Sequence, residues 1–86
     1  MLITRQTIAE KVEAYLRHQI NLNDLVAWAE QEMMEGDFDS QASRDATARL
    51  GVADVRAFGL TWEDCEQLLA SLGFNAKVSI VSVGRI

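Results

Sequence analysis

The stretch TWEDCEQLLASLGFNAKVSIVSV, residues 61–83, contains the two periodicities that decide the fold of this chain. Thr61 is a predicted N-cap, and Asp64 three residues later is typical of the first turn of a helix. Gly73 predicts the left-handed residue that ends this helix, with Phe74 packing back on its last turn. The apolar stripe at helical spacing is Trp62, Cys65, Leu68, Leu69 and Leu72.

After Gly73 the period changes from 3.6 to 2. Apolar side chains alternate with polar ones at Phe74, Ala76, Val78 and Ile80. Val81 and Val83 then add apolar groups on the other face. This pattern predicts one β-strand over about 76–83.

A single strand needs a second strand to satisfy its backbone donors and acceptors. The other extended apolar candidate, Met1–Ile3, is too short to pair with all of it. The strand therefore pairs with its copy in a homodimer, accepts a strand from another protein, or packs along the helices with partial pairing to the N-terminus. A chain this small has a marginal core, which favours association. The residues expected to mediate self-association are Val78, Ile80, Val81 and Val83.

Three further helices are predicted earlier in the chain. They run from about Arg5 to about His18 after Thr4, from Asn21 to Gly36, and from Asp39 or Ser40 to Gly51. Val52–Phe58 is a short piece of one or two helical turns. Four of the five glycines fall at the ends of helical patterns, where left-handed caps are expected.

Two details of packing and charge follow from helical spacing. Ala42, Ala46 and Leu50 are the expected apolar face of the third helix. The expected i,i+4 ion pairs are Glu13–Arg17 and Asp45–Arg49. Because the chain has no repeat or linker, we expect one mainly α domain over residues 1–86. It has four to five short helices packed as a small bundle, and one C-terminal strand.

Composition excludes several classes of protein. There are 8 Lys and Arg against 13 Asp and Glu, a formal net charge of −5, which disfavours binding to nucleic acid or to an anionic membrane surface. No apolar run is long enough to span a bilayer. The absence of a signal peptide and the presence of a single cysteine favour a cytoplasmic location.

Five of the acidic residues lie within ten positions. They are Glu30, Glu32, Glu35, Asp37 and Asp39. No Lys or Arg occurs between Arg17 and Arg44, so the cluster is a solvated face, a docking surface for a basic protein partner, or a divalent-cation site. An EF-hand loop from Asp37 is rejected, because Ala42 takes the glycine position and Ala48 the position of the final glutamate.

The sequence offers no catalytic constellation. Cys65 belongs to an apolar stripe and is expected to be a buried core residue, while His18, the one histidine, is expected at a helix end or on the surface. A dyad of these two residues would require them to meet in the fold. Trp28 and Trp62 are expected to be core or interface anchors. We therefore expect no enzyme activity, no metal site and no cofactor.

The stretch GVADVRAFGLTWEDCEQLLASLGF, residues 51–74, resembles a family of small acidic bacterial proteins of unknown function, and the resemblance implies no activity. Size and acidity are also similar to those of bacterial immunity proteins and antitoxin-like inhibitors, although the tyrosine-rich motifs of the colicin immunity family and of barstar are absent. The expected function is a non-catalytic interaction module that homodimerises through its C-terminal strand. The alternative is an acidic inhibitor or immunity-type protein that binds a basic partner through residues 30–39.

Overall fold

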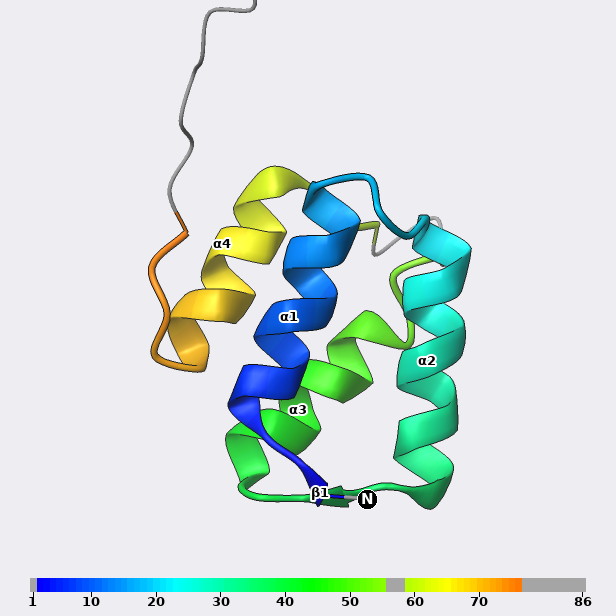
Figure 1. The fold of residues 1–86 in the computed structure, drawn as a ribbon, viewed down its shortest axis with the longest axis vertical. Helices are drawn as coiled ribbons and strands as arrows, with labels where there is room; N and C mark the ends of the chain where they lie inside the picture. Colours follow the sequence, from blue (N-terminus) through cyan, green and yellow to red (C-terminus); the bar gives the residue numbers. More distant parts are fainter. Residues whose placement is uncertain (1, 56–58, 77–86) are drawn as a thin grey trace, which may run out of the picture.

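The computed structural model describes residues 2–55 and 59–76, which form four helices and two short strands. In chain order these are β1 (Leu2–Ile3), α1 (Arg5–Leu16), α2 (Leu22–Glu35), β2 (Asp37–Phe38), α3 (Gln41–Leu50) and α4 (Trp62–Ser71). Figure 1 shows α1 between α2 and α4, and α3 packs against all three other helices. The predicted mainly helical fold is confirmed. The predicted strand over about 76–83 lies outside the described residues, except for Ala76, which is not in a strand.

The four helix starts agree with the sequence prediction. At each start, the N-cap side chain accepts a hydrogen bond from the backbone N–H three residues later. These N-caps are Thr4, Asn21, Ser40 and Thr61. At α4 the bond is reciprocal, because the Asp64 N–H donates to the Thr61 hydroxyl over 3.1 Å and the Thr61 N–H donates to the Asp64 carboxylate over 2.9 Å. Such a cap contributes about 1 kcal/mol to helix stability.

The end of α1 differs from the prediction. The helix stops at Leu16, and His18 follows it in the left-handed region with a φ of 61°. The Gln19 N–H donates to the Ala14 carbonyl over 2.8 Å, and the His18 N–H donates to the Tyr15 carbonyl over 3.1 Å. These two bonds make a Schellman ending in which histidine takes the place that glycine usually holds.

The glycine prediction is correct at the end of α4, and Gly59, the glycine expected to end Val52–Phe58, is left-handed too, with a φ of 47°. Gly73 has a φ of 90° after α4, and the Phe74 N–H donates to the Leu69 carbonyl over 2.9 Å as in a Schellman motif. Gly36 and Gly51 end α2 and α3 with φ values of −85° and −65°, so they are not left-handed caps.

The buried side chains form one cluster to which every helix contributes. Its members are Ile3, Ile8, Val12, Leu25, Ala29, Ala46, Leu50, Cys65, Leu68, Leu69 and Leu72. The predicted stripe of α4 is therefore buried, apart from Trp62, which is half-buried. Removing these side chains from water is the main stabilising contribution to a fold of this size.

The buried face of α3 is more polar than the sequence pattern indicated. Ala46 and Leu50 are buried as expected, but Ala42 is exposed. Ser43 and Thr47 are fully buried in its place, and the Thr47 hydroxyl donates to the Ser43 carbonyl over 2.9 Å. Because these two side chains are small and their hydroxyl groups are hydrogen-bonded, α3 can approach the other helices closely.

The two strands form a parallel pair in which Leu2 lies opposite Asp37 and Ile3 opposite Phe38. The Asp39 N–H adds a hydrogen bond to the Ile3 carbonyl over 3.0 Å. The start of the chain is thereby joined to the connection between α2 and α3. The sequence prediction missed this pair, because two-residue strands are too short to show a period.

The predicted fifth helical piece, Val52–Phe58, is not an α-helix in its described part. The Ala53 N–H bonds to the Leu50 carbonyl over 3.1 Å and the Val55 N–H to the Val52 carbonyl over 3.0 Å, which are the bonds of tight turns. Residues 56–58 lie outside the described part of the chain.

Candidate functional site: a groove between α1 and α4

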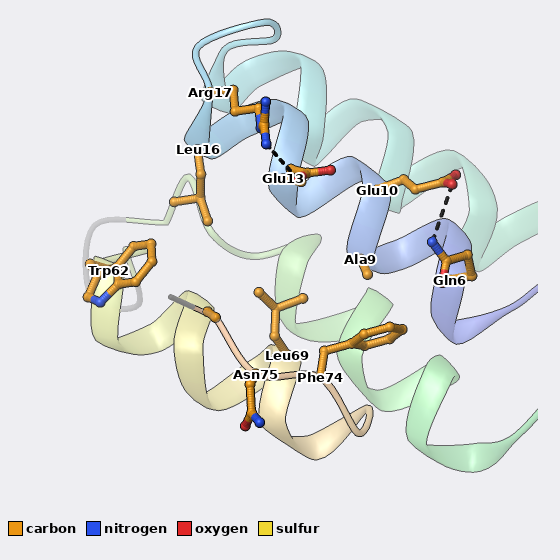
Figure 2. A pocket seen from close by; sticks show the side chains of 11 residues that line it. Gln6, Ala9, Glu10, Glu13, Leu16, Arg17, Trp62, Leu69, Phe74 and Asn75 are labelled. Atoms are coloured by element: carbon orange, nitrogen blue, oxygen red, sulfur yellow. Dashed lines mark hydrogen bonds and ion pairs between the residues drawn. The ribbon is translucent and has the colours of Figure 1, made fainter. Parts of the chain in front are cut away.

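An open groove with a cavity volume of about 570 Å³ lies between α1 and α4 (Figure 2). Its floor is mostly apolar and comes from both helices and from the residues that follow α4. The apolar lining residues are Ala9, Leu16, Trp62, Leu69, Phe74 and Ala76. An apolar group bound on such a surface would be removed from water.

Polar side chains of α1 form one rim of this groove. The Gln6 amide donates to the Glu10 carboxylate over 3.4 Å, and the Arg17 guanidinium lies 3.2 Å from the Glu13 carboxylate. The second contact confirms the predicted i,i+4 ion pair. Figure 2 shows these side chains in a row along α1. The rim therefore presents two carboxylates along the helix and the Arg17 guanidinium at its C-terminal end.

The opposite wall is positioned by the end of α4. The Arg5 guanidinium lies 5.6 Å from the centre of the Phe74 ring, and it donates to the Leu72 carbonyl at the long distance of 3.5 Å. Together with the left-handed Gly73, these contacts direct the chain back alongside α4 (Figure 1). Ala76 is half-buried and lines the groove as a result.

A smaller pocket of about 190 Å³ lies near the start of α4 and brings Cys65 and His18 to the same place. Its lining is Tyr15, Leu16, His18, Leu60, Thr61, Trp62 and Cys65. Burial, with the nearby charge of Asp64, raises the pKa of the Cys65 thiol to about 11. The thiol therefore stays protonated at neutral pH and is a poor nucleophile. The expectation that Cys65 is a buried core residue is confirmed.

The five clustered acids have different surroundings. Glu30 and Glu32 are two residues apart on α2, so they project about 200° apart around its axis. Glu35 and Asp37 are exposed on either side of Gly36. Glu30 is exposed as well, whereas Glu32 is half-buried. Among the described residues, no group of three or more His, Cys, Asp or Glu side chains could hold a metal ion.

Asp39 has a structural environment of its own at the start of α3. A hydrogen bond from the Ser43 hydroxyl is the largest cause that lowers the pKa of its carboxyl below the ordinary value. The Ser40 hydroxyl donates to the same carboxylate over 3.3 Å. Although Asp39 is exposed, its carboxylate thus helps to organise the start of α3.

Arg49 makes contacts that the sequence spacing did not predict. Its guanidinium donates to the Gly59 carbonyl over 2.9 Å and lies 3.5 Å from the Asp64 carboxylate, so it joins α3 to the start of α4. Asp45, the expected partner, accepts a hydrogen bond from the Gln41 amide over 2.8 Å. These contacts join distant parts of the chain, which helical spacing cannot reveal.

The four predicted self-association residues, Val78, Ile80, Val81 and Val83, lie outside the described residues. Sequence reasoning also missed the groove, although it identified Trp62 as a core or interface anchor and Phe74 as packing on α4. The other tryptophan, Trp28, lies 5.5 Å below the Lys11 ammonium and packs against the core.

Across residues 2–55 and 59–76, no helix combines the length and the apolar character that crossing a membrane requires. Comparisons with models of protein families, with curated proteins and with solved structures give no match to this chain.

Proposed function

We propose that this chain is a non-catalytic protein-interaction module that forms a homodimer through a strand at about residues 76–83. The observation that carries the proposal is the pairing of β1 with β2. The N-terminal candidate to pair with the C-terminal strand is Met1–Ile3, and its described residues Leu2 and Ile3 pair with the connection between α2 and α3. A second copy offers an identical strand whose backbone donors and acceptors need the same partners.

The surroundings of Cys65 support a non-catalytic role. Within the described residues, the small pocket beside α4 is where a histidine and a cysteine come together, and the thiol there is protonated at neutral pH. A single buried cysteine also suits the reducing cytoplasm, which is the location that we propose.

Replacing Val81 with proline tests the homodimer. Proline removes a backbone donor from the strand and should break the ladder between the two copies. We expect sedimentation equilibrium to give the mass of a dimer for the natural chain and of a monomer for Val81→Pro, with unchanged helical circular dichroism. The matched control, Val81→Ile, should remain a dimer. A natural chain that stays monomeric at high micromolar concentration would contradict the proposal.

A second candidate function is supported by the acidic residues. Within the described part of the chain, none of Glu30, Glu32, Glu35, Asp37 and Asp39 forms an ion pair with a basic side chain, and all but Glu32 are exposed. Carboxylates of this kind could dock a basic protein, as an acidic inhibitor or immunity-type protein does.

The charge-reversed variant Glu30→Lys/Glu35→Lys tests this second candidate. A basic protein captured from the native cell extract at low salt should be released steeply as NaCl increases, and the variant should not retain it. A variant with Glu63→Lys and Glu66→Lys, which lie on α4, should retain it as the natural chain does. Binding that is insensitive to salt would argue against a docking surface made of carboxylates.

A further inference from the structure

We propose that residues 77–80 of the same chain occupy the groove between α1 and α4, with the side chains of Val78 and Ile80 on its apolar floor. This inference deepens the proposed function and rests on it in treating this segment as a strand. The groove holds one face of the strand, and the second copy pairs with its free edge.

The first argument is the alternation of exposure that leads into the segment. Phe74 and Ala76 are half-buried and line the groove, whereas Asn75 is exposed and its amide points away from α1 in Figure 2. In an extended chain successive side chains point to opposite sides. In the proposed arrangement, an extended chain after Ala76 brings Val78 and Ile80 to the side that faces the groove.

The second argument is length and direction. Residues 74–76 turn back alongside α4, so a chain that continues in this direction runs towards the start of that helix (Figure 1). Along α1 the apolar floor of the groove extends from Ala9 to Leu16, a distance of about 10 Å at the rise of an α-helix. An extended chain advances about 3.3 Å per residue, so three or four residues after Ala76 are enough to fill it.

The third argument is charge. The charged residues of the segment 77–86 are Lys77 and Arg85, which are both basic. The charged side chains that line the groove are Glu10, Glu13 and Arg17, so the net charge of the rim is negative and complements a segment whose charged residues are basic. An apolar peptide from another protein would have to compete with a tethered segment, whose effective concentration is in the millimolar range for a short link.

The arrangement also accounts for the apolar groups that Val81 and Val83 add on the other face of the strand. A strand that is buried on two faces has apolar side chains on both, whereas a strand with one solvated face alternates. With Val78 and Ile80 in the groove, Val81 and Val83 lie on or beyond its outer face. That outer face is then available to the second copy. The same strand thus contacts the groove of its own chain and the second copy.

Trp62 lines the groove and reports on its occupant. In a Trp28→Phe background, Trp62 is the single tryptophan, and we measure its emission wavelength and its quenching by acrylamide. The test compares Ile80→Asp, on the groove side, with the matched control Val81→Asp, on the outer side. We expect Ile80→Asp to shift the emission to longer wavelength and to increase quenching. Val81→Asp should change neither the emission wavelength nor the quenching of Trp62 relative to the Trp28→Phe protein.

The mass of each protein separates this inference from the homodimer. If Trp62 stays shielded on dilution to a concentration where the parent is monomeric, the segment of the same chain covers it. If Trp62 becomes exposed when the dimer dissociates, the inference is overturned, because the second copy and not the same chain would then have covered Trp62. Equal exposure of Trp62 in both aspartate variants would overturn it too, even if the parent remains a dimer. A chain ending at Ala76 that keeps its helical circular dichroism should show the same exposed Trp62 as Ile80→Asp.

Discussion

Cys65 shows how the surroundings of one residue decide its chemistry. Its position near the start of α4 would favour the thiolate, because the N-terminal end of a helix carries partial positive charge. Burial in the core and the neighbouring carboxylate of Asp64 act in the opposite direction and prevail, which raises the pKa to about 11. The meeting of Cys65 with His18 in one pocket therefore does not make a nucleophile.

We expect Cys65 to react slowly with a thiol reagent in the folded protein at pH 8, and rapidly after unfolding in urea. Its rate in the folded protein should rise as the pH approaches 11, and not near 9.0, the ordinary pKa of a cysteine thiol. The unfolded thiol ionises first, so the free energy of unfolding should fall as the pH rises from about 9 to about 11. Cys65→Ser should lack this fall. Equal reaction rates for folded and unfolded protein would contradict the burial of this thiol.

At the scale of the helix, α1 and α4 end by the same hydrogen bonds with different residues in the left-handed position. His18 holds a φ of 61° after α1, and Gly73 holds a φ of 90° after α4. A side chain with a Cβ is strained in this region, whereas glycine is not. At Gly73 an added Cβ would also lie 3.0 Å from the Arg5 guanidinium.

Substitutions at these two helix ends should have opposite effects on the free energy of unfolding. His18→Gly should raise it by about 1 kcal/mol, because it removes the strain of the left-handed conformation. Gly73→Ala should lower it by about 1–2 kcal/mol for the same reason. Urea titrations of both variants measure these changes, with His18→Ala as a control that keeps the Cβ and should not gain stability. A gain in His18→Ala equal to that in His18→Gly would contradict strain as the cause.

At the scale of the whole molecule, the chain start holds the connection between α2 and α3 in place. Ile3 is fully buried in the core, while Leu2, the other residue of β1, is 55% exposed. The backbone pairing with Asp37–Phe38 sets the position of both. A domain of this size has only about 5–15 kcal/mol of net stability, so one buried side chain in such a place matters.

We expect Ile3→Ala to lower the free energy of unfolding by about 2–5 kcal/mol, because it leaves a cavity among core side chains from several helices. Leu2→Ala, in the same strand but exposed, should change it by less than about 0.5 kcal/mol. Denaturant titrations followed by helical circular dichroism measure both. Similar losses in the two variants would show that the strand pairing, and not the buried side chain, carries the stability.

The sequence predicted those features that depend on neighbouring residues. The N-caps at Thr4, Asn21 and Thr61 could be identified, and that of α3 could be narrowed to Asp39 or Ser40, because a helix start is determined by hydrogen bonds across three residues. The buried stripe of α4 followed from its period, and the Schellman ending from Gly73 and Phe74.

Contacts between distant residues could not be predicted in this way. The placement of Arg49 beside Asp64, the exposure of Ala42 and the left-handed His18 each depend on what the rest of the fold brings near. The two-residue strand β2 has no pattern of its own, and it exists because the chain start lies beside it. A single sequence pattern carries no information on such pairings.

By itself, therefore, the sequence determined the helix starts, the helical stripes and the unequal distribution of charge, because these arise from local hydrogen bonding, periodicity and composition. Tertiary structure alone decided the pairing of β1 with β2 and the apolar groove between α1 and α4. The physical reason is that a groove and a strand pair are made from residues far apart in the chain. Their surfaces meet only after the helices have packed around a common core.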